Sequence, residues 1–162
     1  MSNMFEKSKS LKIIKLSSNK FEKPINMNRM FFGYSSLENI FFPSKRIESE
    51  KVKNKNDKLN VIFMTELFYN CKNLKQIDLS IFNTEYVQDM TSILKGCSSL
   101  MKIDLSSFNV NKVKNMNNIF SECILLEEIK LFDLNEINDA VYMPKMFFNC
   151  SNLKHLYIPT NF

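Results

Sequence analysis

Apolar residues recur along the chain with a period close to 26 residues. One run lies at i, i+3, i+4 and i+7, positions that share a helix face: Met64, Leu67, Phe68 and Cys71. Leu74, Ile77 and Leu79 follow, and the last two lie two residues apart, as on one face of a strand. The pattern therefore predicts a unit made of a short helix, a tight link and a short strand.

Six units align along residues 1–162. The first helical column is Met1, Met27, Met64, Met90, Met116 and Met143. The last strand column is Leu16, Phe42, Leu79, Leu105, Leu131 and Ile158. One such unit cannot bury its apolar face alone, but stacked neighbours can. We expect a single α/β domain, a leucine-rich-repeat-like solenoid of about six coils, with a short helix and strand in each and a parallel sheet along one face.

One interval between units is longer than the others. Met27 and Met64 are 37 residues apart instead of 26, and the excess falls in residues 44–60. This segment is rich in lysine and almost free of large apolar side chains. It is therefore predicted to be an exposed insertion between the second and third coils.

Four cysteines raise the question of metal binding or disulfides. They are 26, 26 and 27 residues apart, no Cys-x-x-Cys occurs, and His155 is the single histidine. Structural zinc needs four clustered ligands, so no metal site is predicted. The cysteines are interpreted as small buried apolar side chains, with disulfides between neighbouring coils as the alternative.

The motifs of common enzyme sites are missing. No nucleophile elbow and no repeated carboxylate pair is found, and two glycines leave no room for a phosphate-binding loop. We therefore expect no enzyme activity, no cofactor and no small-molecule substrate. The net charge is +5, and no apolar run is long enough to span a bilayer.

The segment from Met90 to Phe120, MTSILKGCSSLMKIDLSSFNVNKVKNMNNIF, resembles the 26-residue surface-protein repeat of the BspA-like leucine-rich repeat group. The match is close over residues 61–134, and it is looser towards both ends. The resemblance implies a surface or secreted, adhesin-like protein that binds other proteins or host components. The chain as given begins with no apolar signal segment, so localisation at the cell surface is an expectation from the resemblance alone.

The outward rows of the predicted strands form the candidate protein-binding face, which is the usual binding surface of solenoids. Its residues are Lys15, Phe41, Gln76, Asp78, Lys102, Asp104, Glu128, Lys130, Phe132, His155 and Tyr157. Three of them, Phe132, His155 and Tyr157, have two interpretations: an aromatic patch, since aromatic residues are enriched at interaction hot spots, or side chains that pack against a further repeat. A solvated, charge-balanced sheet is the alternative interpretation of the rest.

Three functions follow as hypotheses. The first is a module that binds an unidentified protein partner, with the two uncapped ends as contacts for self-association. The second is an intracellular repeat scaffold. The third is a basic module that uses the Lys-rich segment on nucleic acid or an anionic membrane, although nucleic acid is not expected because no aromatic residues interleave with these lysines.

Overall fold

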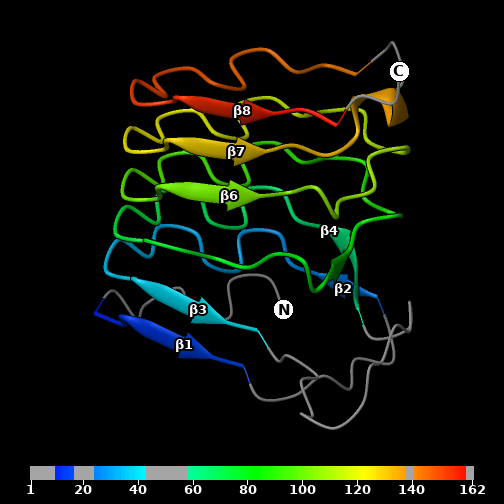
Figure 1. Cartoon of the computed structure of the whole chain (residues 1–162). Helices are drawn as coiled ribbons and strands as arrows, with labels where there is room; N and C mark the ends of the chain where they lie inside the picture. The colour runs from blue at the N-terminus through cyan, green and yellow to red at the C-terminus, as the bar shows by residue number, and fades with distance from the viewer. Residues whose placement is uncertain (1–9, 17–23, 43–57, 138–140, 160–162) are drawn as a thin grey trace, which may run out of the picture.

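The computed structural model describes residues 10–16, 24–42, 58–137 and 141–159 (Figure 1). These residues form a parallel β-solenoid of about five turns. The expected helical segment of the unit that begins at Met1 and most of the predicted insertion lie outside the described residues. The last two residues of that insertion, Leu59 and Asn60, begin strand β4, and Leu59 is buried.

One side of the solenoid carries the predicted parallel sheet. Strands β1 (Ile13–Lys15) and β3 (Asn39–Phe41) pair at one end, and β6 (Lys102–Asp104), β7 (Glu128–Lys130) and β8 (His155–Tyr157) pair at the other (Figure 1). The coil between them is joined to β3 by a single bridge from Asn39 to Gln76. The register places residues of one predicted column opposite each other, as in Ile103, Ile129 and Leu156.

A second row of parallel pairing runs behind this sheet. It joins β2 (Ile25–Asn26), β4 (Leu59–Phe63) and β5 (Phe82–Asn83), and it continues as the isolated bridges Asp89–Asn115 and Asn115–Tyr142. Between the two rows, the predicted core columns point inward, and most are fully buried in the middle coils. A short 3₁₀ helix, η2 (Leu134–Glu136), follows β7.

The predicted α/β architecture is wrong, because the described residues contain no α-helix. Each expected helical segment that the structure describes is instead a run of turns, at residues 28–33, 65–70, 91–96, 117–122 and 144–149. In each run two residues four positions apart have positive φ, as do Glu66 (55°) and Asn70 (57°), or Ser92 (57°) and Gly96 (76°). An α-helix cannot contain such residues, so the chain turns twice and continues around the coil.

The backbone hydrogen bonds explain why turns replace the helix. In the third coil, the amides of Leu67, Tyr69 and Cys71 donate to the carbonyl three residues earlier, which closes tight turns. The intervening amides of Glu66, Phe68 and Asn70 donate to the next coil, at Thr91, Ile93 and Lys95. Every second amide of the turn segment therefore donates its hydrogen bond to the neighbouring coil, whereas in an α-helix it would donate within the helix. The neighbouring coil thus satisfies the donors that turns alone would leave unpaired.

The cysteine column follows from the same geometry. The thiol Sγ of Cys71 donates to the carbonyl of Phe31 (3.0 Å), and the thiol Sγ of Cys97 to that of Phe68 (3.2 Å). Cys123 and Cys150 repeat this contact with Leu94 and Phe120. All four cysteines are free, and burial raises the pKa of the Cys71 thiol to about 12. Cys71, Cys97 and Cys123 are buried and Cys150 is half-buried, and each thiol links its coil to the one before it.

Stacked aromatic rings add a second contact between coils in the same segments. Phe31 and Phe68 lie with ring centroids 5.3 Å apart, and Phe120 and Phe147 lie 5.6 Å apart, with the rings nearly parallel in both pairs. Such pairs stabilise a fold beyond the area that they bury. Stacking of equivalent side chains therefore adds to the cohesion between these coils.

Candidate binding face

The outward face of the parallel sheet carries most of the predicted binding residues on consecutive coils. Side chains alternate along each short strand, so that β6 buries Ile103 and exposes Lys102 and Asp104 on either side of it. Strand β1 has the same alternation. The face is therefore built from rows of side chains that repeat from coil to coil.

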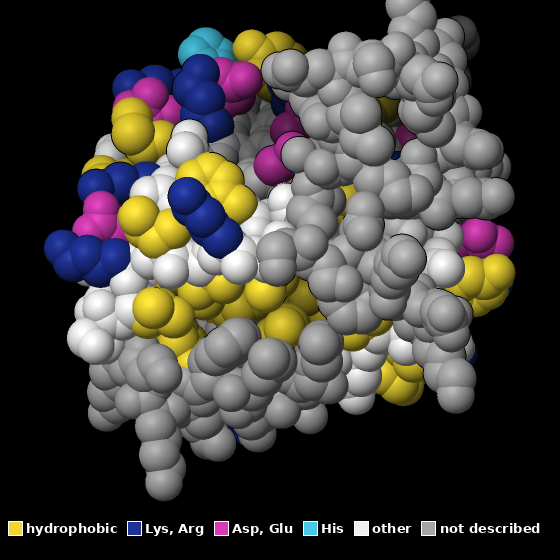
Figure 2. Space-filling model, turned by 90° about the horizontal axis from the view of Figure 1, so that it is seen from below, with side chains coloured by type: hydrophobic (Ala, Val, Ile, Leu, Met, Phe, Trp, Pro, Cys, Tyr) yellow, Lys and Arg dark blue, Asp and Glu magenta, His cyan; other side chains and the backbone are white. Residues whose placement is uncertain are grey.

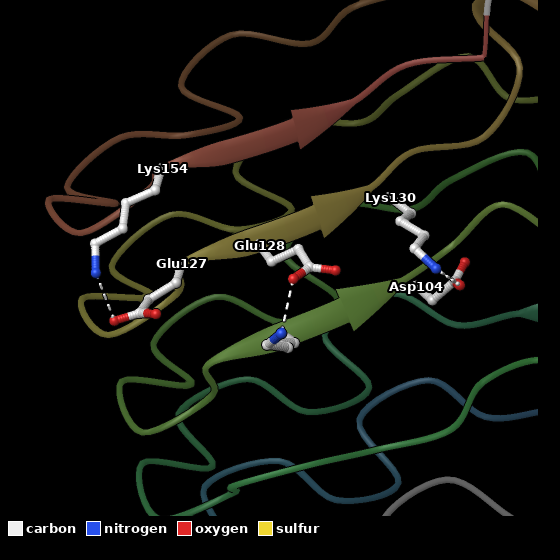
Figure 3. Close-up of polar contacts among 6 residues, drawn as sticks. Asp104, Glu127, Glu128, Lys130 and Lys154 are labelled. Carbon is white, nitrogen blue, oxygen red and sulfur yellow. Dashed lines mark hydrogen bonds and ion pairs between the residues drawn. The ribbon is translucent and has the colours of Figure 1, made fainter.

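Ion pairs connect neighbouring coils in the C-terminal half of this face. Lys102 lies 2.7 Å from Glu128, and Lys130 lies 3.4 Å from Asp104. Figure 3 shows the pairs of Lys130 with Asp104 and of Lys154 with Glu127, which reach from one strand to the next. Opposite charges at facing strand positions stabilise the pairing, and exposed pairs contribute little each.

The charges shift the pKa values of the acidic members. The Lys102 ammonium lowers the pKa of the Glu128 carboxyl below its ordinary value and is itself held protonated, with a raised pKa. The pKa of Asp104 is lowered first by its hydrogen bond with the Ser106 hydroxyl and then by Lys130. Glu128, Lys102 and Asp104 are therefore charged at neutral pH. Asp104 also accepts from the Ser106 amide and thereby fixes the turn after β6.

Asp78 and Gln76 occupy the coil where the sheet pairing is interrupted. A hollow of about 290 Å³ opens beside them, lined by the segments from Asn39 to Phe41 and from Gln76 to Asp78. Phe41 is 47% exposed there, and Lys15 on β1 lies with its Nζ 5.9 Å from the Phe41 ring centroid. This hollow brings together Phe41, Gln76 and Asp78 of the predicted face.

The predicted aromatic patch at the other end is smaller than expected. His155 and Tyr157 are exposed on β8, with ring centroids 6.3 Å apart. Phe132, which was assigned to the outward row, is fully buried instead. The chain leaves the strand register directly after β7, so the period-2 alternation that was extended from Lys130 to Phe132 no longer holds there.

A row of charges missed by the sequence reasoning lies one residue before the rows that were chosen. Lys12 and Lys75 both pair with Glu38, at 3.4 and 2.7 Å, and Lys154 pairs with Glu127 at 3.0 Å. The alternating signs at repeat intervals in this column were a readable signal. In Figure 2, cationic and anionic side chains gather together along one side of the molecule, and hydrophobic side chains show between the grey regions.

Two further features bear on function, a metal site and a membrane-spanning helix, and the described residues contain neither. Among the described residues, no three His, Cys, Asp or Glu side chains come close enough together to hold a metal ion. The same part of the chain has no helix whose length and apolar character would suit a bilayer crossing. Self-association through the ends stays a prediction, which a sedimentation coefficient independent of concentration would contradict.

Comparisons with known proteins connect the chain to one family. The family model described as "Mycoplasma protein of unknown function, DUF285" matches residues 1–54 and 35–159. No curated protein and no solved structure gave a match. The two matched stretches together cover nearly the whole chain, including the coils that were recognised from the apolar columns.

Proposed function

Since the chain belongs to the DUF285 family, we propose that it is a non-enzymatic repeat module that binds a protein partner through the outward sheet face. The family description names no activity, so the proposal rests on the face itself. The resemblance of the repeat sequence to the BspA-like surface repeat supports an adhesin-like role at the cell surface.

The observation that carries the proposal is the exposed Phe41 beside the hollow in the sheet. Phe41 is 47% exposed on a face where many charged side chains pair with one another. Its neighbours Gln76 and Asp78 supply hydrogen-bonding groups at the rim of the hollow. An exposed aromatic side chain next to a recess and polar groups is the arrangement found at the centres of protein interfaces.

The paired charges on the same face suit a polar rim: Glu38 with Lys12 and Lys75 lies beside this centre, and the other pairs lie in the C-terminal half. Rim charges influence the rate of association and the choice of partner more than the affinity. The ion pairs of the C-terminal half therefore favour an extended contact, with the energetic centre near Phe41.

The test compares two exposed aromatic residues on different surfaces. Tyr142, which is 60% exposed, lies in the second row of pairing and is the control for Phe41. Proteins from host cell surfaces are captured with the unchanged chain, with Phe41→Ala and with Tyr142→Ala. The proposal expects at least one protein whose Kd rises more than about tenfold with Phe41→Ala, because truncating a hot spot costs about 2 kcal/mol, and hardly changes with Tyr142→Ala.

Two results would count against the proposal. One is capture of no protein by the unchanged chain, and the other is an equal loss for both variants. Surface exposure needs its own measurement, which is protease shaving of intact source cells followed by determination of the mature N-terminus. A chain that stays fully protected from the protease would contradict the adhesin-like role.

A further inference from the structure

A polar groove crosses three successive coils at the corner after the sheet face. It encloses about 660 Å³ and is bounded by side chains that carry amides or charges. The residues that matter for its chemistry are Lys58, Asn60, Asn83, Glu85, Asn109 and Lys112. We call this set the asparagine groove. It is separate from the hollow beside Phe41, since the two share no lining residue.

The groove exists because one coil departs from the repeat. In the later coils a turn separates Asn83 from Val87, and the amide of Val87 donates to Thr84 to close it. In β4 the corresponding Asn60 is followed directly by Val61, so the chain runs straight. Pairing of Leu59 with Phe82 still holds Asn60 next to Asn83. The missing turn leaves a recess beside the turns of the next two coils.

Hydrogen bonds within the groove occupy the side-chain oxygens of Asn60, Asn83 and Asn109, and they leave two of the three side-chain nitrogens without an acceptor among the described residues. Asn83 Oδ1 accepts from the Glu85 amide, and Asn109 Oδ1 accepts from the Asn111 amide, which are the bonds of Asx turns. Asn60 Oδ1 accepts from Asn83 Nδ2 at 2.9 Å. Within the described part of the chain, the Nδ2 groups of Asn60 and Asn109 have no acceptor. The groove therefore offers two free amide donors to a ligand, beside the Glu85 carboxylate, the Ser107 hydroxyl and the Asn111 amide that also line it.

The charged side chains of the groove, and an aromatic ring beside one of them, add to its ability to bind a ligand. Two ammonium groups, Lys58 and Lys112, face a single carboxylate, Glu85. Lys112 Nζ lies 4.5 Å from the centroid of the Tyr86 ring, which is 48% exposed. The groove thus combines hydrogen-bond donors with a small positive excess, and the Tyr86 ring that Lys112 contacts is a partly exposed apolar surface next to its lining.

We propose that the asparagine groove binds an acidic oligosaccharide. Sugar hydroxyl and carboxylate oxygens would accept from the free asparagine amides, a carboxylate would pair with Lys58 or Lys112, and a pyranose ring would lie against Tyr86. Coils are about 4.8 Å apart along the stack, so the free amides of Asn60 and Asn109, on either side of the Asn83 coil, present donors along an extended chain. Nucleic acid fits less well, because two lysines partly offset by Glu85 would neutralise few phosphates and one ring would stack few bases.

The decisive variant is Asn109→Asp. Aspartate keeps the Oδ acceptor that the Asn111 amide needs, so the Asx turn survives, but it replaces the free donor by a negative charge. Asn115→Asp is the matched control, because Asn115 Oδ1 accepts from the Asn117 amide in the same kind of turn, outside the groove. Asp89 accepts from the Thr91 amide in the equivalent turn of the preceding coil, so aspartate is compatible with that geometry.

Isothermal titration at physiological ionic strength would use oligomers of hyaluronan, polygalacturonate and polysialic acid as probes, with maltohexaose as the neutral sugar and oligo(dT) as the nucleic-acid probe. We expect at least one acidic oligosaccharide to bind, with affinity reduced at least tenfold by Asn109→Asp and by Tyr86→Ala. Asn115→Asp and Tyr142→Ala should leave it unchanged. Equal thermal unfolding temperatures for the two aspartate variants confirm that the fold is retained.

Three outcomes would overturn the inference. They are binding of no acidic oligosaccharide, equal weakening by Asn109→Asp and Asn115→Asp, and tighter binding of oligo(dT) than of any sugar. If Asn109→Asp lowers the unfolding temperature, Lys112→Gln with Lys154→Gln as its control replaces it, since both lysines are exposed. Failure here leaves the proposed protein-binding role open, because that role is tested at Phe41.

Discussion

The middle coils and the last described coil carry the same apolar columns, yet they bury them to very different extents. Met90 and Met116 are fully buried, whereas Met143 in the same column is 42% exposed. Ile103 and Ile129 are buried, and Leu156, which pairs with Ile129, is 39% exposed. The side chains are equivalent, so the difference comes from the number of neighbouring coils. A coil in this solenoid receives its burial from both neighbours and cannot supply it alone.

This comparison predicts that the largest difference in stability appears when two residues of one strand column, in a middle coil and in the last described coil, are shortened to alanine. Ile129→Ala in β7 should lower the free energy of unfolding by about 2–5 kcal/mol, because it leaves a cavity between two coils. Leu156→Ala in β8 should cost about 1 kcal/mol, because much of that side chain is already in contact with water. Urea unfolding followed by circular dichroism measures both. Equal losses would show that the last coil is as well packed as the middle ones.

The cysteine column should show the same gradient through its thiols. Cys97 is fully buried and Cys150 is half-buried, and burial raises the pKa of both thiols. A thiol-specific reagent should therefore modify Cys150 in the folded protein and reach Cys97 only after unfolding. Mass spectrometry of the labelled peptides gives the order of reaction. Faster labelling of Cys97 than of Cys150 would contradict the assigned burial.

Alkaline pH should weaken the fold through these thiols. Burial raises the pKa of Cys71 from its ordinary value of 9.0 to about 12. Between these values the unfolded chain releases the proton and the folded chain keeps it, so stability falls as pH rises, by at most about 1.4 kcal/mol per pH unit for one thiol. Unfolding of Cys71→Ala at pH 8 and pH 10 should show a smaller decline than unfolding of the unchanged chain. An identical decline would mean that other groups cause it.

The smallest effect is expected on the sheet face. Lys102 lowers the pKa of Glu128, so the stabilisation from this pair is present at neutral pH and is lost as pH falls through that lowered pKa. Lys102→Ala should return the Glu128 pKa towards its ordinary value, which an NMR titration of the carboxyl detects. Lys75→Ala, which removes a contact of Glu38 instead, should leave Glu128 unchanged. A Glu128 titration unaffected by Lys102→Ala would show that the pair does not form in solution.

The repeat columns could be read from the sequence because the core of a solenoid is made of equivalent positions. The predicted strand column pairs in register between Ile14 and Ile40 and from Ile103 through Ile129 to Leu156, whereas Ile77 of the same column lies outside the strands. The helix was predicted wrongly, because positions i, i+3, i+4 and i+7 also face one way in two successive turns that place positive φ four residues apart. Asn70, Gly96 and Asn149 sit at such positions and are residue types that tolerate them.

The sequence also predicted which side chains of the candidate face point outward in most cases, but it did not predict the groove that forms between coils. Alternation in the strands correctly predicted that Phe41, Lys102 and Tyr157 face outward. It failed for Phe132, since the alternation stops where the strand stops. The asparagine groove could not be found from any single coil. It depends on a straight β4 lying beside turns of later coils, which no local pattern expresses.

The sequence by itself therefore determined the length of the repeat, the inward columns and their register, because identical spacing forces identical side chains to stack. The tertiary structure decided whether each unit is helical. Amides of the turn segments can bond within the chain or to the next coil, and only the presence of that coil makes the second choice favourable. The tertiary structure also decided which side chains of a column are buried, because the burial of each side chain depends on the adjacent coil, whose residues lie about 26 positions away in the sequence.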